Sequence, residues 1–246
     1  MERKKPGPRI TVFAHLFYPS LFNEILPFLL GLSEYNVHHY INVGSDFSVD
    51  QVQNQIRKAL PSCFLLQSPN KGKDIGGKLA LLELYIQLKE TSDYFIFIHD
   101  KLSPQLLNGD KWRNQLLRIL EVKAIKEILQ LFETASDIGI IGSKEHISNE
   151  YNQETSSFES TNDQLLQGYI QELGLKNKQF PFIAGNMFWI RSSIFESFFK
   201  IHPPLLLRSG LEPGNVTDTD KGTRTHSLER IFSWIALDQG YRIKGI

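Results

Sequence analysis

The sequence predicts an α/β protein with a mostly parallel central sheet that is flanked by helices. Up to residue 98, apolar segments of strand length alternate with segments that have apolar residues at helical spacing. The segment 94–98, YFIFI, is a continuous apolar run, which is typical of a central strand covered on both faces. His99, Asp100 and Lys101 follow it. Any buried strand must surface in polar residues, but ligands of open α/β sheets bind at the carboxyl ends of strands, so these residues mark a candidate site.

Strands and helices are expected to alternate strictly in the first part of the chain. The expected strands cover residues 9–17, 37–43, 63–66 and 94–98, and the expected helices cover residues 21–32, 48–60 and 79–88. Ser48 is a suitable N-cap for the second helix, which stops before Pro61. The order β-α-β-α-β-α-β indicates a parallel, doubly wound sheet that begins like a nucleotide-binding domain.

The second part of the chain continues the pattern less regularly. Strands are expected at residues 137–142, 180–191 and 241–246, and helices at residues 112–132, 164–172, 192–200 and 226–239. The strand-like segment 180–191 is interrupted by small residues at 184–186, the Gly-, Asp- and Thr-rich segment 211–225 is predicted to be a mobile loop, and Gly240 is predicted to cap the last helix. Without repeats or low-complexity linkers, residues 1–246 are predicted to form one domain, with residues 1–8 flexible.

Composition excludes several classes of protein. Lys plus Arg equals Asp plus Glu at 27 each, so no overall charge favours nucleic acid. Cys63 is the only cysteine, which excludes an internal disulfide and a cysteine-rich zinc site and fits a reducing compartment. The basic amino terminus lacks the apolar core of a signal peptide, and no run approaches the roughly 18 to 20 apolar residues of a membrane span. We therefore expect a cytoplasmic protein that is soluble or at most peripheral to a membrane.

A basic, glycine-rich turn precedes the helix at 79–88. It comprises Asn70, Lys71, Gly72, Lys73 and Asp74, with Gly76 and Gly77 close behind. The lysine side chains, together with backbone N–H groups around the glycines, could bind an anion. The alternative interpretation is a solvated basic turn, and the turn alone does not decide between the two.

Several segments in order resemble one known family. They are HLFYPSLFNEILPFL, NKGKDIGG, DYFIFIHDK with KWRNQLL, DIGIIGS, FIAGNMFWIR and GTRTHSLERIFSWIALDQGY. Together, over roughly residues 10 to 241, they resemble the rhamnan synthesis F family of bacterial polysaccharide glycosyltransferases. The resemblance implies a GT-A-like, Rossmann-like domain. It also implies that rhamnose passes from dTDP-rhamnose to a cell-surface polysaccharide, by an inverting reaction.

The resemblance leaves the role of a metal open. In GT-A enzymes the corresponding strand usually ends in an Asp-x-Asp that holds a divalent metal on the sugar-nucleotide diphosphate, whereas this chain has His99-Asp100-Lys101. Lys101 could neutralise the diphosphate in place of a metal, because a fixed ammonium stabilises negative charge in a similar way. Asp100 and His99 could instead bind Mg²⁺ or Mn²⁺.

The resemblance also assigns residues to the donor. Asp74 would contact the base or ribose of the nucleotide, although it could equally cap the helix that follows. His15, at the end of the first strand, would belong to the donor site or else be a core histidine. Gly185 and Asn186 would line the pocket for sugar and acceptor.

Glu229 is the predicted general base. In inverting GT-A enzymes the base is a carboxylate early in a late helix, and the segment HSLERIF fits that position. Asp218 and Asp220, in the preceding loop, are the rival bases. His226 and Arg230 could contact phosphate from the same helix, whose amino end favours anions.

These assignments define the expected partners. They are a dTDP- or UDP-sugar donor and a glycan or lipid-linked glycan acceptor, with peripheral association at the inner face of the membrane as a further option. A second class of function is a non-catalytic nucleotide-sugar-binding module or one domain of a larger synthase. A dinucleotide enzyme is the weakest alternative, because HLFYPS stands where G-x-G-x-x-G would follow the first strand.

Overall fold

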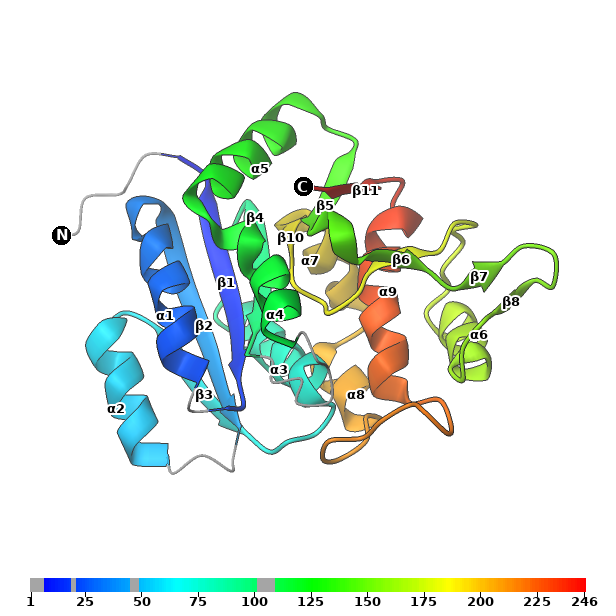
Figure 1. Ribbon diagram of the computed structural model, residues 1–246, viewed down its shortest axis with the longest axis horizontal. Coiled ribbons are helices and arrows are strands. Elements are labelled where there is room, and N and C mark those ends of the chain that lie inside the picture. Colours follow the sequence, from blue (N-terminus) through cyan, green and yellow to red (C-terminus); the bar gives the residue numbers. More distant parts are fainter. Residues whose placement is uncertain (1–6, 19–20, 45–48, 101–108) are drawn as a thin grey trace.

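The computed structural model describes residues 7–18, 21–44, 49–100 and 109–246. These residues form a central sheet of seven strands in the order β11-β5-β10-β4-β1-β2-β3 (Figure 1). The strands are β1 Arg9–Leu16, β2 Asn36–Gly44, β3 Phe64–Ser68, β4 Tyr94–His99, β5 Ile138–Gly142, β10 Phe188–Arg191 and β11 Arg242–Gly245. All neighbouring strands pair in parallel except β10, which is antiparallel to both β4 and β5. The predicted α/β fold with a mostly parallel sheet is confirmed.

Helices cover both faces of this sheet. One face packs against α1 Phe22–Gly31, α2 Val49–Ala59, α4 Gly109–Leu117 and α5 Val122–Thr134, and the other against α3 Lys73–Gln87, α7 Ser192–Ile201, α8 Pro204–Ser209 and α9 Arg224–Asp238. The sheet separates two hydrophobic cores, and successive residues of β1 point into them alternately. Val12 and Ala14 pack on the first face and Phe13 on the second. The continuous apolar runs in the sequence are explained by this double burial.

The predicted alternation of the first part is confirmed, with one correction at α3. The helix begins at Lys73, so Gly76 and Gly77 lie inside it and not in a preceding turn. The N–H of Gly76 donates to the carbonyl oxygen of Gly72 at 2.8 Å and is therefore satisfied within the helix. Gly72 is the N-cap, which makes the alternative role of Asp74 as N-cap wrong. Ser48, the predicted N-cap of α2, lies outside the described residues.

The single helix expected over residues 112–132 is wrong. The chain forms α4, the short 3-10 turn Arg118–Leu120 and then α5, with Glu121 in an extended conformation at the break. The break is tied to the sheet, because the indole N–H of Trp189 donates to the carbonyl oxygen of Ile119 at 3.0 Å. The short helix α8, which begins with Pro204, was not predicted.

The segment 180–191 is interrupted as expected, and its two halves join different sheets. β9 Pro181–Ile183 pairs with β6 Ile147–Asn149, whereas β10 inserts into the main sheet between β4 and β5. The strands β7 Tyr151–Asn152 and β8 Ser157–Phe158 and the helix α6 Asp163–Glu172 form an extension beside α9 (Figure 1). The helix expected at 164–172 is therefore confirmed. The turn between β9 and β10 faces the start of α9 across the pocket described below.

The last helix and strand agree with the predictions made from the sequence. Gly240 has φ of 83° and its N–H donates to the carbonyl oxygen of Leu237 at 3.0 Å, which is the expected glycine stop. β11 then pairs with β5 at the edge of the sheet.

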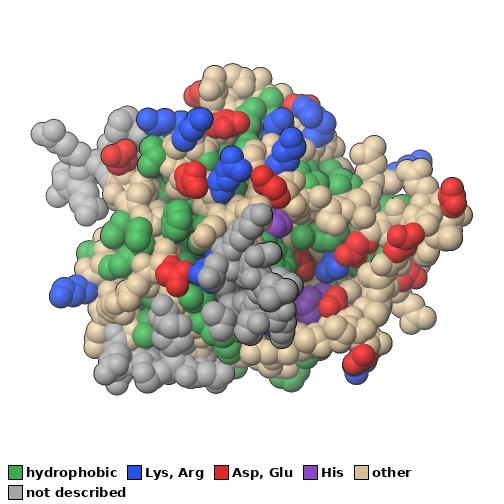
Figure 2. All heavy atoms as spheres, in the orientation of Figure 1, with side chains coloured by type: hydrophobic (Ala, Val, Ile, Leu, Met, Phe, Trp, Pro, Cys, Tyr) green, Lys and Arg blue, Asp and Glu red, His purple; other side chains and the backbone are tan. Residues whose placement is uncertain are grey.

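The surface bears charges of both signs. Figure 2 shows basic and acidic side chains intermixed over one face, in keeping with their equal numbers in the sequence. Among the described residues, no helix combines the length and apolarity that a bilayer crossing needs.

Candidate active site

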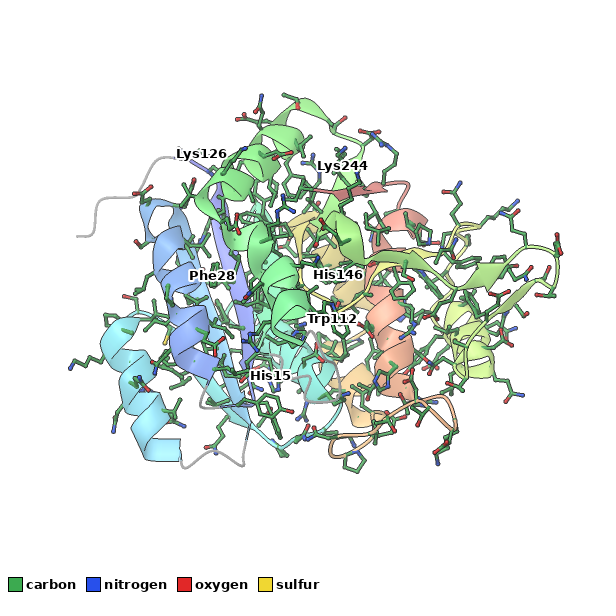
Figure 3. All side chains as sticks on the ribbon, viewed as in Figure 1. His15, Phe28, Trp112, Lys126, His146 and Lys244 are labelled. Carbon is green, nitrogen blue, oxygen red and sulfur yellow. The ribbon has the colours of Figure 1, made fainter. Side chains whose placement is uncertain are left out.

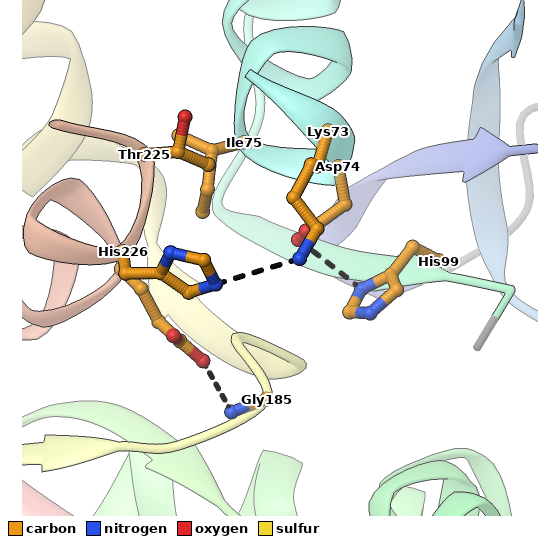
Figure 4. A pocket seen from close by; sticks show the side chains of 8 residues that line it. Lys73, Asp74, Ile75, His99, Gly185, Thr225 and His226 are labelled. Carbon is orange, nitrogen blue, oxygen red and sulfur yellow. Dashed lines mark hydrogen bonds and ion pairs between the residues drawn. The ribbon is translucent and has the colours of Figure 1, made fainter. Parts of the chain in front are cut away.

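A pocket opens where the carboxyl end of β4 meets α3, α9 and the β9–β10 turn (Figure 4). Its walls come from four segments that are far apart in the sequence, and the lining residues are Lys73, Asp74, Ile75, His99, Gly185, Thr225, His226 and Glu229. Sequence reasoning selected all of them except Ile75 and Thr225. The strand-end rule pointed to His99, whereas Gly185, His226 and Glu229 were selected from the family resemblance.

The floor of the pocket is an ionic network around Asp74. Its Oδ2 lies 2.8 Å from Nζ of Lys78 and 3.4 Å from Nδ1 of His99. Burial would raise the pKa of Asp74, but the charge and hydrogen bond of the adjacent Lys78 ammonium oppose it, and that pKa is held well below its usual range. Lys78 Nζ also lies 3.0 Å from Nδ1 of His99. Because an ammonium is donor-only, this contact assigns Nδ1 as the acceptor and places the ring proton of a neutral His99 on Nε2.

Glu229 is fixed in the opposite wall by the β9–β10 turn. The N–H of Gly185 donates to its Oε1 at 2.6 Å, and Nη1 of Arg230 lies 3.4 Å from its Oε2. Both contacts fix the orientation of the Glu229 side chain. Arg230 itself is held by Glu150 through two contacts of 2.6 and 3.1 Å and stacks over the ring of Phe182. Its guanidinium therefore supports Glu229 and does not line the pocket.

His226 and Lys73 close the upper side of the pocket. Lys73 Nζ lies 3.4 Å from Nε2 of His226 and donates to the carbonyl oxygen of Val216 at 3.3 Å (Figure 4). Burial and the charge of Lys73 lower the pKa of His226, so the imidazole is neutral at pH 7. Nε2 then accepts from Lys73, and Nδ1 donates to the hydroxyl of Thr223 at 2.6 Å.

The backbone beside the pocket adopts left-handed conformations on both sides. Lys73 and Asn186, neither of them glycine, have φ of 51° and 50°, and their neighbours Gly72 and Gly185 have φ of 77° and 81°. Left-handed backbone costs non-glycine residues free energy and is concentrated at functional sites. Lys89 and Ser156 adopt the same conformation in other parts of the chain, so left-handed backbone accompanies the pocket but does not by itself identify it.

Asn186, which was expected to line the pocket, is not among its lining residues, and its buried amide has no partner in the part of the chain that the structure describes. The residue is 1% exposed, and neither its Oδ1 nor its Nδ2 makes a hydrogen bond with the described residues. Its carbonyl oxygen, by contrast, accepts from Lys78 at 2.7 Å. A buried amide with no partner costs free energy, so a ligand that satisfies it would gain that amount on binding.

The glycine-rich motif serves packing more than anion binding. A Cβ on Gly72 would lie 2.2 Å from the side chain of Leu211, and a Cβ on Gly76 would lie 1.7 Å from the carbonyl oxygen of Lys71. Asn70 bonds Asn215, and Lys71 forms a β-bridge with Pro213. Asn70, Lys71 and Gly72 therefore meet the segment 211–215, outside the pocket lining.

That segment also blocks the expected anion site at the start of α9. The carboxylate of Glu212 accepts the backbone N–H groups of Arg224 at 2.6 Å and Thr225 at 3.0 Å. The hydroxyl of Thr225 donates to it as well, at 2.7 Å. The favourable end of the helix dipole is thus already paired with a carboxylate of the chain itself.

His15 lies beneath α3 and does not line the pocket (Figure 3). It is 4% exposed, its Nδ1 accepts from the amide of Asn42 at 2.8 Å, and burial lowers its pKa to about 4. A Cβ on Gly77 would lie 2.1 Å from that same nitrogen, so the ring packs directly against the helix backbone. These contacts are those of a neutral core histidine.

Asp100 points away from the pocket. Both of its carboxylate oxygens accept the N–H of Phe17, at 2.8 and 2.7 Å, and one also accepts the N–H of Tyr18. Burial raises its pKa to about 7, against the effect of these hydrogen bonds. Lys101 lies outside the described residues. Within the described ranges, no cluster of three His, Cys, Asp or Glu side chains could hold a metal.

The rival bases lie outside the pocket lining. The carboxylate of Asp218 accepts from the amide of Asn162 at 2.8 Å and lies 4.0 Å from Nδ1 of His226. Asp220 is exposed to solvent. Of the three carboxylates considered as base, Glu229 alone lines the pocket.

Lys78 is the main residue that sequence reasoning missed. It is fully buried and joins α3 to β4 and to the β9–β10 turn. Its spacing of four residues from Asp74 is a helix ion-pair signal that the sequence does contain.

Two solved structures are similar to this chain at a low level. Glucosyl-3-phosphoglycerate synthase from Mycobacterium tuberculosis, solved with Mn²⁺, UDP and glucosyl-3-phosphoglycerate, is 14% identical with a TM-score of 0.43, over 97% of this chain and 70% of that one. Core-mannan synthase A from Aspergillus fumigatus, in an Mn/GDP form, is 10% identical with a TM-score of 0.27, over 96% and 86% of the two chains.

The sequence match to a protein family is more specific than the similarity to solved structures. No curated protein matches the chain. The family model described as rhamnan synthesis protein F, however, matches residues 1–241, which is nearly the whole sequence. The chain therefore belongs to the rhamnan synthesis protein F family.

Proposed function

We propose that the protein is a GT-A-like nucleotide-sugar glycosyltransferase. In this proposal it transfers rhamnose from dTDP-rhamnose, with inversion, to a bacterial cell-surface polysaccharide of the O-antigen, capsule or rhamnan type. The observation that carries the proposal is the pocket at the end of β4, in which the Glu229 carboxylate faces Lys73, Asp74 and His99. Family membership supports the choice of polysaccharide synthesis.

The chemistry requires a base, a place for the diphosphate and a place for the sugar. The acceptor hydroxyl gives its proton to Glu229 as its oxygen bonds the sugar carbon, and the bond from that carbon to the diphosphate oxygen breaks. Lys73 is the one lysine or arginine among the described residues that line the pocket, so it is assigned to the departing diphosphate. Asp74 is assigned to the nucleotide, and the amide of Asn186 to sugar hydroxyls.

The acceptor in this proposal is a glycan or a lipid-linked glycan, reached at the inner face of the cell membrane. A non-catalytic nucleotide-sugar-binding module, or one domain of a larger polysaccharide synthase, is the competing function. The Glu229 carboxylate in the pocket wall favours an enzyme, because a binding module needs no base at that place.

A panel of nucleotides separates these functions. We expect dTDP or UDP, but not NAD⁺ or NADP⁺, to raise the melting temperature of the protein, because binding to the folded state alone stabilises it. Slow hydrolysis of dTDP-rhamnose, measured as dTDP release, should accompany binding in an enzyme and not in a module. Stabilisation by NAD⁺ alone would contradict the proposal.

Asn186→Gly tests the sugar contact separately from the nucleotide. Glycine tolerates the left-handed backbone at this position and removes the side chain that carries the amide. We expect the affinity for dTDP to be unchanged and the affinity for dTDP-rhamnose to fall about tenfold, the effect of losing roughly 1.4 kcal/mol of hydrogen bonding. Isothermal titration with the two ligands measures the difference. An equal loss for both would move Asn186 to the nucleotide.

A further inference from the structure

The ammonium of Lys78 sits among three acceptors from three separate parts of the chain. Its Nζ lies 2.8 Å from Oδ2 of Asp74, 3.0 Å from Nδ1 of His99 and 2.7 Å from the carbonyl oxygen of Asn186. An ammonium has three N–H donors, so each acceptor can receive one of them. The side chain is fully buried, directly behind the lining residues Asp74 and His99.

A carboxylate, an imidazole and a carbonyl are also metal ligands. Carboxylate and carbonyl oxygens suit Mg²⁺ and Mn²⁺, and imidazole nitrogen suits several transition metals. Here the same lone pairs point at Lys78, and the oxygens of Asp100 are bonded to backbone N–H groups of Phe17 and Tyr18. The described residues at the end of β4 therefore do not fit the divalent metal that the resemblance to GT-A enzymes implies.

We infer that Lys78 is the resident cation of this site and that the protein binds its nucleotide diphosphate without a divalent metal. The second half of this inference rests on the proposed function, whereas the first half does not. Lys78 is a positioning residue: it ties α3, the end of β4 and the strained β9–β10 turn to one point. Asp74 and His99 are thereby held in the pocket wall, and the Asn186 backbone is fixed where its amide is buried.

Titration with Mn²⁺ in the absence of nucleotide tests the first half of the inference, that Lys78 is the resident cation of the site. Electron paramagnetic resonance reports free Mn²⁺ directly. We expect the wild-type protein to leave Mn²⁺ free, and Lys78→Ala to bind one ion per chain, because the variant exposes three converging ligands and removes the charge that occupies them. Lys123→Ala, an exposed lysine on α5, is the matched control and should behave as wild type. In the double variant Lys78→Ala/Asp74→Asn the binding should be lost.

Stoichiometric Mn²⁺ binding by the wild type would overturn the inference, as would a folded Lys78→Ala protein that leaves Mn²⁺ free. Circular dichroism establishes whether the variant folds, and if it does not, the wild-type titration decides. The second half is tested by titrating the wild type with dTDP and UDP in EDTA and in Mn²⁺. Affinities equal within a few fold are expected, and affinity lost in EDTA would overturn the metal-free assignment. If neither nucleotide binds under either condition, the proposed function fails while the Mn²⁺ titration still stands.

Discussion

Glu229→Gln is expected to lower turnover by at least about 10²-fold while donor affinity stays within a few fold. The amide keeps the shape of the side chain, and its oxygen can still accept the N–H of Gly185. What it loses is the ability to take a proton from the acceptor hydroxyl, which is a poor nucleophile at neutral pH. Steady-state kinetics with a saturating acceptor, together with titration of the donor, separates the two effects.

Asp218→Asn and Asp220→Asn are the controls for this substitution. Asp218 is bonded to Asn162 and Asp220 is exposed, and neither lines the pocket. Both variants should retain most of the wild-type turnover. Near-normal turnover of a folded Glu229→Gln protein, combined with an inactive Asp218→Asn or Asp220→Asn, would place the base in the loop before α9.

Gly76→Ala should destabilise the protein by about 3 kcal/mol, at the upper end of the usual cost of overpacking. In an open helix the same change stabilises by roughly 1 kcal/mol. Here the new Cβ would lie 1.7 Å from the carbonyl oxygen of Lys71, which is backbone and cannot rotate away. The helix would have to shift from the turn at its own start. Urea unfolding followed by circular dichroism measures the change in the free energy of unfolding.

Gly168→Ala is the matched control. Gly168 is an exposed glycine within α6, and a Cβ built there meets nothing within 4 Å. This substitution should raise the free energy of unfolding by about 0.5 to 1 kcal/mol. Stabilisation by both substitutions would show that α3 does not pack as closely on its preceding turn as the structure has it.

The periodicity of apolar residues predicted those strands and helices that leave a local pattern in the sequence. β4 and α9 were found because double burial and helical spacing leave direct traces in the sequence. The start of α3 was placed too late because glycine disfavours helix in isolation. In the folded chain, the close contact with the carbonyl oxygen of Lys71 requires glycine at position 76 and overrides that preference. Such contacts cannot be predicted from local sequence patterns.

The strand-end rule and the family resemblance together pointed to residues of the pocket, but not to the residues that support it. Lys78 reaches Asn186 across 108 positions of sequence, and Arg230 reaches Glu150 across 80. The local sequence around Lys78 and Arg230 contains no pattern that identifies these distant partners. The pairing of Glu212 with backbone N–H groups at the start of α9 was missed for the same reason, because Glu212 reaches them from the preceding loop.

The late position of β10 in the sequence determines when the edge of β4 becomes covered during synthesis. β1 to β4 emerge early and can pair among themselves, but β4 then presents a bare apolar edge until β10 has been synthesised. An uncovered edge with the sequence YFIFI can recruit the same edge of a neighbouring nascent chain. Overexpression and truncation ahead of residue 188 should therefore favour aggregates, and a holding chaperone that covers β4 during synthesis should favour the soluble protein.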